Sequence, residues 1–145
     1  MTEETQHSRQ RKYTNMLIIL AVMIVVSVFS YLHGEAAVQL NWNETQVQIT
    51  TPDDNSFTIL YNDICRTELI DHPNYGTCIQ GDKTASWLYG IWENSTWGTY
   101  TLCAADGVDL CIVLHTETQV YVLSYESDET TSALYNSILT LIHQQ

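Results

Sequence analysis

The most apolar stretch of the chain lies near its start, where residues 16–32 read MLIILAVMIVVSVFSYL without a charged side chain. A helix of these 17 residues rises roughly 25 Å, close to the roughly 30 Å thickness of the hydrocarbon core of a bilayer. Lys12 and Tyr13 at one end, and Tyr31 and His33 at the other, suit the membrane interfaces. The pattern predicts a transmembrane helix at residues 16–33, preceded by residues 1–15 and followed by a short spacer at residues 34–37.

After the spacer, apolar and polar residues alternate, which is the pattern of strands with one buried face. Val38, Leu40 and Trp42 open the alternation, and Asp106-Gly107 is one of several turn signals that interrupt it. The segments recur about every ten residues, as in a sandwich or a barrel. The strands expected from this pattern are residues 38–42, 46–50, 57–70, 86–93, 97–103, 110–114 and 120–125.

The spacing of apolar residues changes in the last part of the sequence. Apolar side chains recur there at i, i+4, i+7 and i+8, at Leu134, Ile138, Leu141 and Ile142. This spacing forms one stripe along a helix. Ser127, followed by two acidic residues, supplies an N-cap and a favourable first turn. The pattern predicts one amphipathic helix that packs on the strands.

Several short runs in this region combine hydrophobic residues with glycines. They are Ile59-Leu60-Tyr61-Asn62-Asp63-Ile64, Gly76, Gly81 and Gly90 with Trp92, Trp97-Gly98-Thr99-Tyr100, Ile112-Val113-Leu114, Tyr121-Val122-Leu123-Ser124 and Leu134-Tyr135. Through these runs, residues 45–143 resemble the bacterial pleckstrin-homology-like (PH-like) domains, especially small membrane-anchored ones. The resemblance implies a mainly β fold, in which a curled antiparallel sheet of about seven strands is plugged at one open end by the C-terminal amphipathic helix.

Charge is distributed unevenly along the chain, whose formal net charge is −12. Residues 1–15 carry three basic and two acidic side chains, whereas residues 33–145 carry two basic and 15 acidic ones. The positive-inside rule therefore predicts a single-pass protein of the cell membrane, with a cytosolic N-terminus and the domain at residues 38–145 outside. A cleaved signal peptide is the alternative, because small residues follow the apolar stretch, and cleavage would also export the domain.

All four cysteines lie in the part of the chain that we expect to be exported, where an oxidising environment favours disulfides. Cys103 and Cys111 flank the Asp106-Gly107 turn, and Cys65 and Cys78 flank another turn-rich segment. This placement favours the pairs Cys65–Cys78 and Cys103–Cys111. Four cysteines allow three pairings, and free buried thiols are a further alternative.

Five aromatic residues crowd into one short segment, namely Trp87, Tyr89, Trp92, Trp97 and Tyr100. If these rings are exposed, they can stack on sugars or anchor a protein partner, and if they are buried they form part of the core. Because they alternate between the two sides of the expected strands, we expect some of them to face outward as a candidate binding surface.

The sequence points away from several classes of function. His72, His115 and His143 are scattered, and no nucleophile, phosphate-loop or zinc motif occurs, so we expect no catalytic residue, metal site or cofactor. A small enzyme is retained as an alternative in case His72 or His115 gathers two carboxylates. The acidity argues against nucleic-acid binding. The PH-like domains that bind phosphoinositides use basic residues around the first hairpin, whereas residues 41–45 have none, so the resemblance does not imply phosphoinositide binding here.

These observations predict a membrane-anchored, non-catalytic extracytoplasmic binding or assembly module, with a protein or a glycan as partner. The alternative from another class is a secreted carbohydrate-binding β-domain released by signal cleavage. Asn43 and Asn94 begin glycosylation sequons, which matter only in a eukaryotic or eukaryotic-virus source.

Overall fold

The computed structural model describes residues 19–25 and 38–143, which belong to two separate units of the chain. The described residues of the first unit, 19–25, are helical, and no helix among the described residues is long and apolar enough to cross a membrane. The predicted transmembrane segment at 16–33 lies largely outside the described residues, as do the predicted N-terminal segment and spacer.

The second unit begins with a three-stranded antiparallel sheet, ordered β1-β2-β3. Its strands are β1 (Gln39–Trp42), β2 (Gln46–Thr50) and β3 (Ser56–Leu60). Alternation gives the sheet one buried face, on which Val47 pairs with Ile59 and both side chains are shielded from water. The turn between β1 and β2 is held by the Asn43 side chain, whose Oδ1 accepts hydrogen bonds from the backbone N–H groups of Thr45 and Gln46.

A 3-10 helix, η1 (Tyr61–Asp63), leads into a six-stranded sheet. The strands of this sheet are β4 (Ile64–Asp71), β5 (Thr77–Lys83), β6 (Trp87–Asn94), β7 (Gly98–Ala105), β8 (Leu110–Thr116) and β9 (Val120–Leu123). They are ordered β4-β8-β9-β7-β6-β5. Strand β9 lies between β7 and β8 and runs parallel to β7, while all the other pairs in the sheet are antiparallel.

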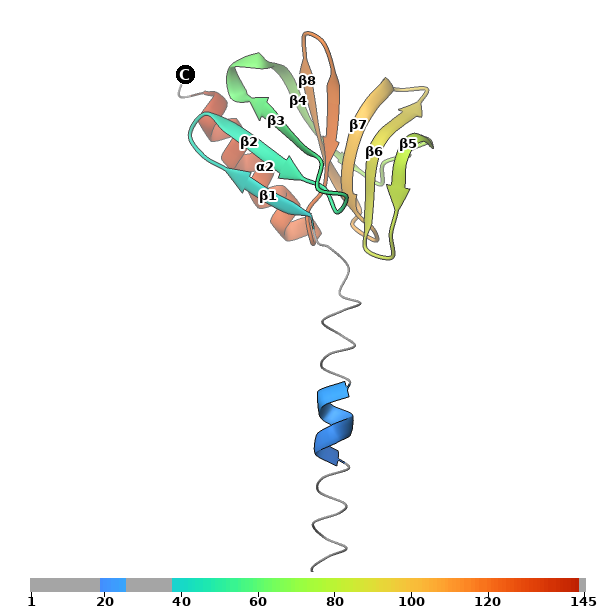
Figure 1. The fold of residues 1–145 in the computed structure, drawn as a ribbon. Helices are drawn as coiled ribbons and strands as arrows, with labels where there is room; N and C mark the ends of the chain where they lie inside the picture. The colour runs from blue at the N-terminus through green and yellow to red at the C-terminus, as the bar shows by residue number, and fades with distance from the viewer. Residues whose placement is uncertain (1–18, 26–37, 144–145) are drawn as a thin grey trace, which may run out of the picture. The chain divides into compact units, whose positions relative to one another are not determined.

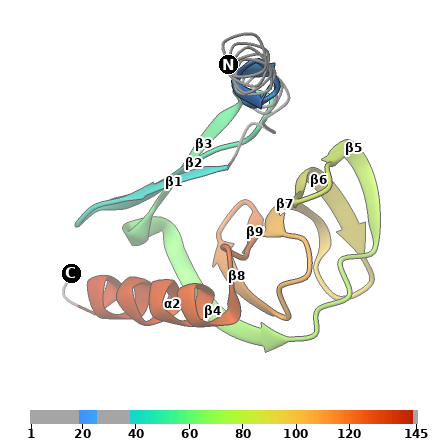
Figure 2. The ribbon, with the colours of Figure 1, turned by 90° about the horizontal axis from the view of Figure 1, so that it is seen from below.

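The chain then forms the helix α2 (Asp128–Ile142), as predicted. A capping box starts it, because the Ser127 side chain accepts from the Thr130 N–H and the Thr130 side chain accepts from the Ser127 N–H. Its apolar stripe packs against η1, β4 and β8. Figures 1 and 2 show α2 beside the three-stranded sheet and the edge of the six-stranded sheet that β4 and β8 form.

Apolar side chains fill both sides of the six-stranded sheet. One core lies among the two sheets and α2, and it includes Ile49, Tyr61, Leu114 and Ile138. The second core lies on the other side of the six-stranded sheet, which bends around it (Figure 2). Its members are Leu88, Trp92, Tyr100, Leu102, Ala104, Cys111, Val113 and Val122. The segment between β4 and β5 covers this second core, and the Tyr100 hydroxyl donates a hydrogen bond there to the Tyr75 carbonyl.

The mainly β fold with a terminal helix is confirmed, but two details of the sequence prediction are wrong. The described residues form nine strands in two sheets, rather than about seven in one curled antiparallel sheet. The six-stranded sheet also stays open, because its edge strands β4 and β5 do not pair with each other. Strand β5 escaped prediction because every one of its residues is exposed, so it carries no alternation of buried and exposed positions.

Candidate functional site

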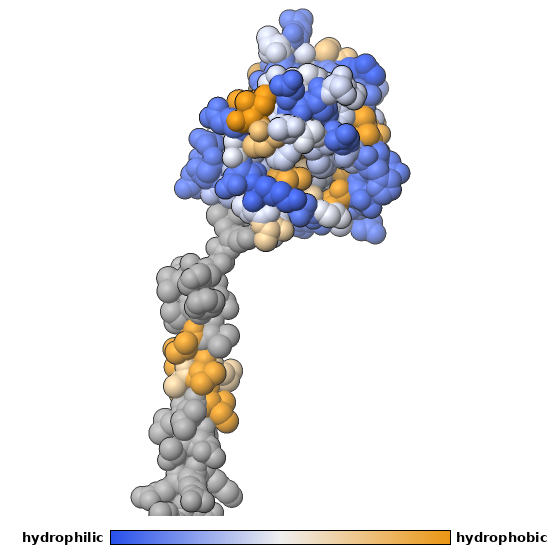
Figure 3. Space-filling model, turned by 90° about the vertical axis from the view of Figure 1, so that its right-hand side faces the viewer, coloured by the Kyte–Doolittle hydropathy of each residue, from blue (hydrophilic) through white to orange (hydrophobic). Residues whose placement is uncertain are grey.

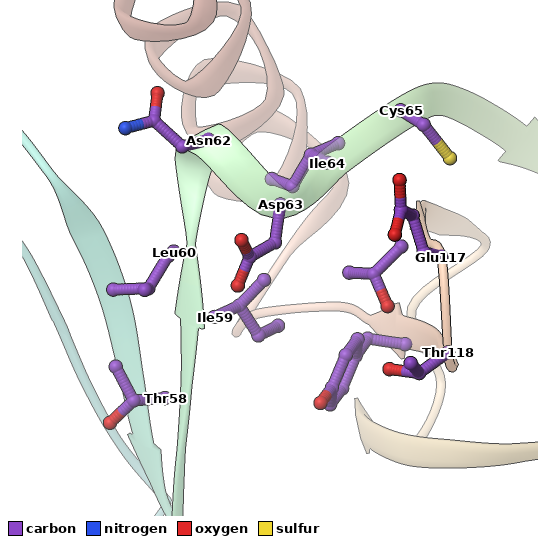
Figure 4. A pocket seen from close by; sticks show the side chains of 11 residues that line it. Thr58, Ile59, Leu60, Asn62, Asp63, Ile64, Cys65, Glu117 and Thr118 are labelled. Atoms are coloured by element: carbon purple, nitrogen blue, oxygen red, sulfur yellow. The ribbon is translucent and has the colours of Figure 1, made fainter.

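A cavity of about 420 Å³ opens where the two sheets meet (Figure 4). It lies between β3, η1, the start of β4 and the turn that joins β8 to β9. Its lining residues are Thr58, Ile59, Leu60, Asn62, Asp63, Ile64, Cys65, Thr116, Glu117, Thr118 and Tyr121. This volume falls within the roughly 300–1,000 Å³ of typical ligand pockets.

The cavity runs along the edge of β3 at which no strand of the described residues pairs. Three consecutive residues, 58–60, line it, although successive side chains of a strand point to opposite faces, so the cavity must border the strand's edge. Backbone bonds from Tyr61 N–H to the Thr45 carbonyl and from Thr51 N–H to the Asn55 carbonyl fix which pairs of the β2–β3 ladder are hydrogen-bonded. By alternation, the backbone groups of Thr58 and Leu60 point away from β2.

An aromatic pair bridges the two sheets beside the cavity. Phe57 of β3 stacks on Tyr121 of β9, with ring centroids 5.6 Å apart and an angle of 16° between the ring planes. Ile59, which is only 2% exposed, adds a buried apolar wall. This contact joins β3 to the start of β9, next to the cavity that Tyr121 lines.

Two acidic side chains give the cavity a negative charge. The carboxylates of Asp63 and Glu117 point into the space between η1 and the β8–β9 turn, while the Asn62 side chain points away (Figure 4). The two basic residues of the described domain are engaged elsewhere, Arg66 with Glu68 at 3.1 Å and Lys83 with Asp106 at 3.6 Å. The site therefore favours a cationic ligand.

The expected disulfide between Cys65 and Cys78 is wrong. Cys65 lies on β4 beside the cavity, where its thiol donates to the His115 carbonyl at 3.2 Å. Cys78 lies on β5, at the opposite edge of the six-stranded sheet. Both thiols are free and exposed, and the width of the sheet separates them.

The expected bridge between Cys103 and Cys111 is also wrong, because β7 and β8 do not form the predicted hairpin. Strand β9 lies between them, with Leu123 paired to both Cys103 and Ile112. The Cys103 side chain enters the first core and the Cys111 side chain enters the second, so the two free thiols face opposite sides of the sheet. Burial raises the pKa of each thiol to about 12.

The predicted aromatic binding surface is core instead. Trp87 and Tyr89 belong to the first core, and Trp92 and Tyr100 belong to the second. Trp97 is half-buried and packs edge-on against Tyr100, with ring centroids 5.2 Å apart. Both sets of rings are covered because the sheet is buried on both faces. On the face shown in Figure 3, hydrophobic residues of the domain form small separate patches among hydrophilic ones.

The histidines of the described domain do not converge on the cavity. His115 Nε2 lies 2.8 Å from the Glu68 carboxylate and so contacts one carboxylate, whereas the enzyme alternative required two. His72 lies 3.2 Å from Asp109 and 3.7 Å from Asp71, on the exposed surface. Neither histidine lines the cavity. Within residues 19–25 and 38–143, no group of three or more potential ligands is placed to hold a metal ion.

Sequence reasoning missed the residues that form this cavity. Asp63 and Glu117 are 54 positions apart in the sequence, and only the pairing of β4 with β8 brings them together. The sequence carries one signal here, the polar pair Thr116-Glu117 between two expected strands, which indicates a turn but no site.

Comparison with known proteins adds no precedent for this arrangement, since no protein-family model, curated protein or solved structure matches the chain. The candidate site is therefore defined by its own geometry and charge.

Proposed function

We propose that this chain is a membrane-anchored, non-catalytic binding module whose domain lies outside the cell and binds its ligand in the cavity beside β3. The observation that carries the proposal is the position of the cavity, which borders an edge of β3 that no described strand pairs with and is lined by two carboxylates. The apolar stretch at residues 16–33 and the basic residues before it support the anchor and a cytosolic N-terminus.

A distant relation to the PH-like domains is part of this proposal. The bent sheet and the terminal helix support it. The separate three-stranded sheet and the parallel pair of β7 and β9 depart from the pattern that the resemblance implies. The function therefore rests on the cavity, because one fold can host unrelated functions.

A protein partner fits the structure better than a glycan. The carbohydrate alternative needs exposed rings on which sugars can stack. Four of the five clustered aromatic residues are less than 9% exposed, and Trp97 is half-buried against Tyr100. The non-catalytic part of the proposal is supported by His72 and His115, neither of which lines the cavity and which contact different carboxylates.

Site-specific photo-crosslinking in the native membrane tests this proposal. A photoreactive amino acid replaces Leu60 at the cavity, and in a matched variant it replaces Ile79 on β5, another exposed apolar strand residue. We expect a discrete crosslinked adduct from position 60 and none from position 79. The same adducts from both positions, or none from position 60, would overturn the proposal.

A further inference from the structure

We infer that the ligand of this cavity is an extended, basic segment of another polypeptide, which pairs with β3 as a fourth strand of the three-stranded sheet. A Lys or Arg side chain of that segment lies between Asp63 and Glu117. The inference rests on the proposed function, because it names the class of ligand for the same site.

The backbone of β3 supplies the first argument. Thr58 and Leu60 each turn an N–H and a C=O away from β2, toward the side where no described strand pairs with β3. These groups recur at every second residue, which is the spacing that an added antiparallel strand requires. A sugar or a small amine cannot satisfy them in this repeating order, whereas an extended polypeptide can.

Charge supplies the second argument. Residues 38–143 contain 14 acidic and two basic side chains, a net charge of −12, and both basic side chains are already in ion pairs. Such a field attracts cationic segments and repels anionic lipids, nucleic acids and acidic peptides. At the cavity itself, two carboxylates point into the space that a side chain of the added strand would enter.

The edge strand β5 is a poorer platform for the same kind of pairing. It contains a bulge between Cys78 and Gln80, followed by a glycine, and both features bend a strand away from regular pairing. It contributes no residue to the cavity. Strand β3, in contrast, pairs with β2 in an unbroken register from Ser56 to Leu60.

Residue-resolved amide hydrogen exchange tests the pairing directly. The probe is a blocked peptide with alternating threonine and valine and two lysines, added to the full chain in detergent micelles. Strand addition should slow exchange at the amides of Thr58 and Leu60, while Phe57 and Ile59, already bonded to β2, should change little. The same peptide with N-methyl groups on alternate backbone nitrogens should give no protection.

Charge variants test the position of the cationic side chain. Glu117→Gln and Asp63→Asn should each weaken binding of the lysine peptide by about twofold to fivefold, the range of an exposed ion pair. Glu126→Gln is the matched control, because Glu126 is an exposed acid that does not line the cavity. It should leave the affinity unchanged, and raised salt should weaken binding of the unmodified chain.

Each of the following results would overturn the inference: protection along β5 in place of β3, equal binding of the N-methylated peptide, equal binding of a matching peptide with glutamate in place of lysine, or binding of spermidine as tight as that of the peptide. Protection of Thr58 and Leu60 that grows with protein concentration alone would also overturn it, by identifying a second copy of the chain as the occupant. A crosslink at position 60 without peptide binding would reject the inference and leave the proposed function standing. If neither the crosslink nor peptide binding is observed, both the inference and the proposed function are rejected.

Discussion

Gly81 and Gly90 face each other across β5 and β6, and each has a positive φ, +139° and +110°. A Cβ atom on Gly90 would lie 2.5 Å from the Gly81 Cα, and a Cβ on Gly81 would lie 2.7 Å from the Gly90 Cα. The two strands therefore approach at this pair more closely than side chains permit, which lets the edge of the six-stranded sheet bend around the second core.

Replacing one of these glycines should destabilise the domain. For Gly90→Ala we expect a loss of at least about 2 kcal/mol in the free energy of unfolding, because the new methyl group is both strained and in contact with backbone. Gly107→Ala is the control, since its φ is +80° but nothing lies within 4 Å of the added Cβ. Urea denaturation measures both variants, and equal losses would show that backbone contact at Gly90 is unimportant.

The start of α2 offers a second prediction. Ser127→Ala removes the capping acceptor for the Thr130 N–H and should lower the free energy of unfolding by about 1 kcal/mol. Ser137→Ala is the matched control, because the Ser137 hydroxyl bonds only to the Ala133 carbonyl one turn back in the helix. The control should be neutral or slightly stabilising, since alanine favours a helix interior. A similar loss for both variants in thermal or urea unfolding would contradict the capping role.

The buried thiols should make stability fall at alkaline pH. The unfolded chain loses thiol protons near pH 9, whereas burial delays ionisation of Cys103 and Cys111 to about pH 12 in the folded chain. The contribution of the protonated thiols to the free energy of unfolding is therefore complete below pH 9. It is lost as pH rises from 9 to 12, with each thiol losing about 1.4 kcal/mol for every pH unit.

Urea titrations between pH 8 and pH 11 measure this slope. Replacing both buried cysteines with alanine should flatten it, although the variant is less stable overall. Replacing the exposed Cys65 and Cys78 is the control and should leave the slope unchanged. An unchanged slope in the first variant would show that the buried thiols do not carry the effect.

Thiol labelling tests the predicted topology. A membrane-impermeant maleimide added to intact cells should modify the exposed Cys65 and Cys78 and spare the buried pair until the chain is denatured. A Thr2→Cys substitution in a chain with all four natural cysteines removed should stay unlabelled until the cells are opened. Labelling of that N-terminal thiol in intact cells would reverse the proposed orientation, and a mature mass without residues 1–33 would show signal cleavage.

Most strands and the helix could be predicted from the sequence because apolar residues recur at different intervals in them, about every two residues in β6 to β9 and every 3.6 residues in α2. It could not predict the insertion of β9 between β7 and β8, since periodicity marks strands but carries no information on their order in a sheet. That single insertion invalidated the Cys103–Cys111 pair.

The residues of the candidate site could not be predicted from the sequence either, because tertiary packing decides which side chains are covered and which line a cavity. Trp87 and Trp92 fall on opposite faces of β6, and the alternation could not reveal that both faces of the sheet are covered. Asp63 and Glu117 belong to no sequence motif. They line one cavity because the pairing of β4 with β8 brings η1 next to the β8–β9 turn.

Strand β9 also governs how the domain is assembled. Strands β5, β6 and β7 form a meander, while β4 and β8 form a separate long-range ladder, and β9 is the strand that pairs with both groups. Until β9 has entered, β7 and β8 each present an unpaired apolar edge, which is the kind of surface that promotes aggregation. We therefore expect substitutions that weaken this four-residue strand to expose both edges at once and to promote aggregation.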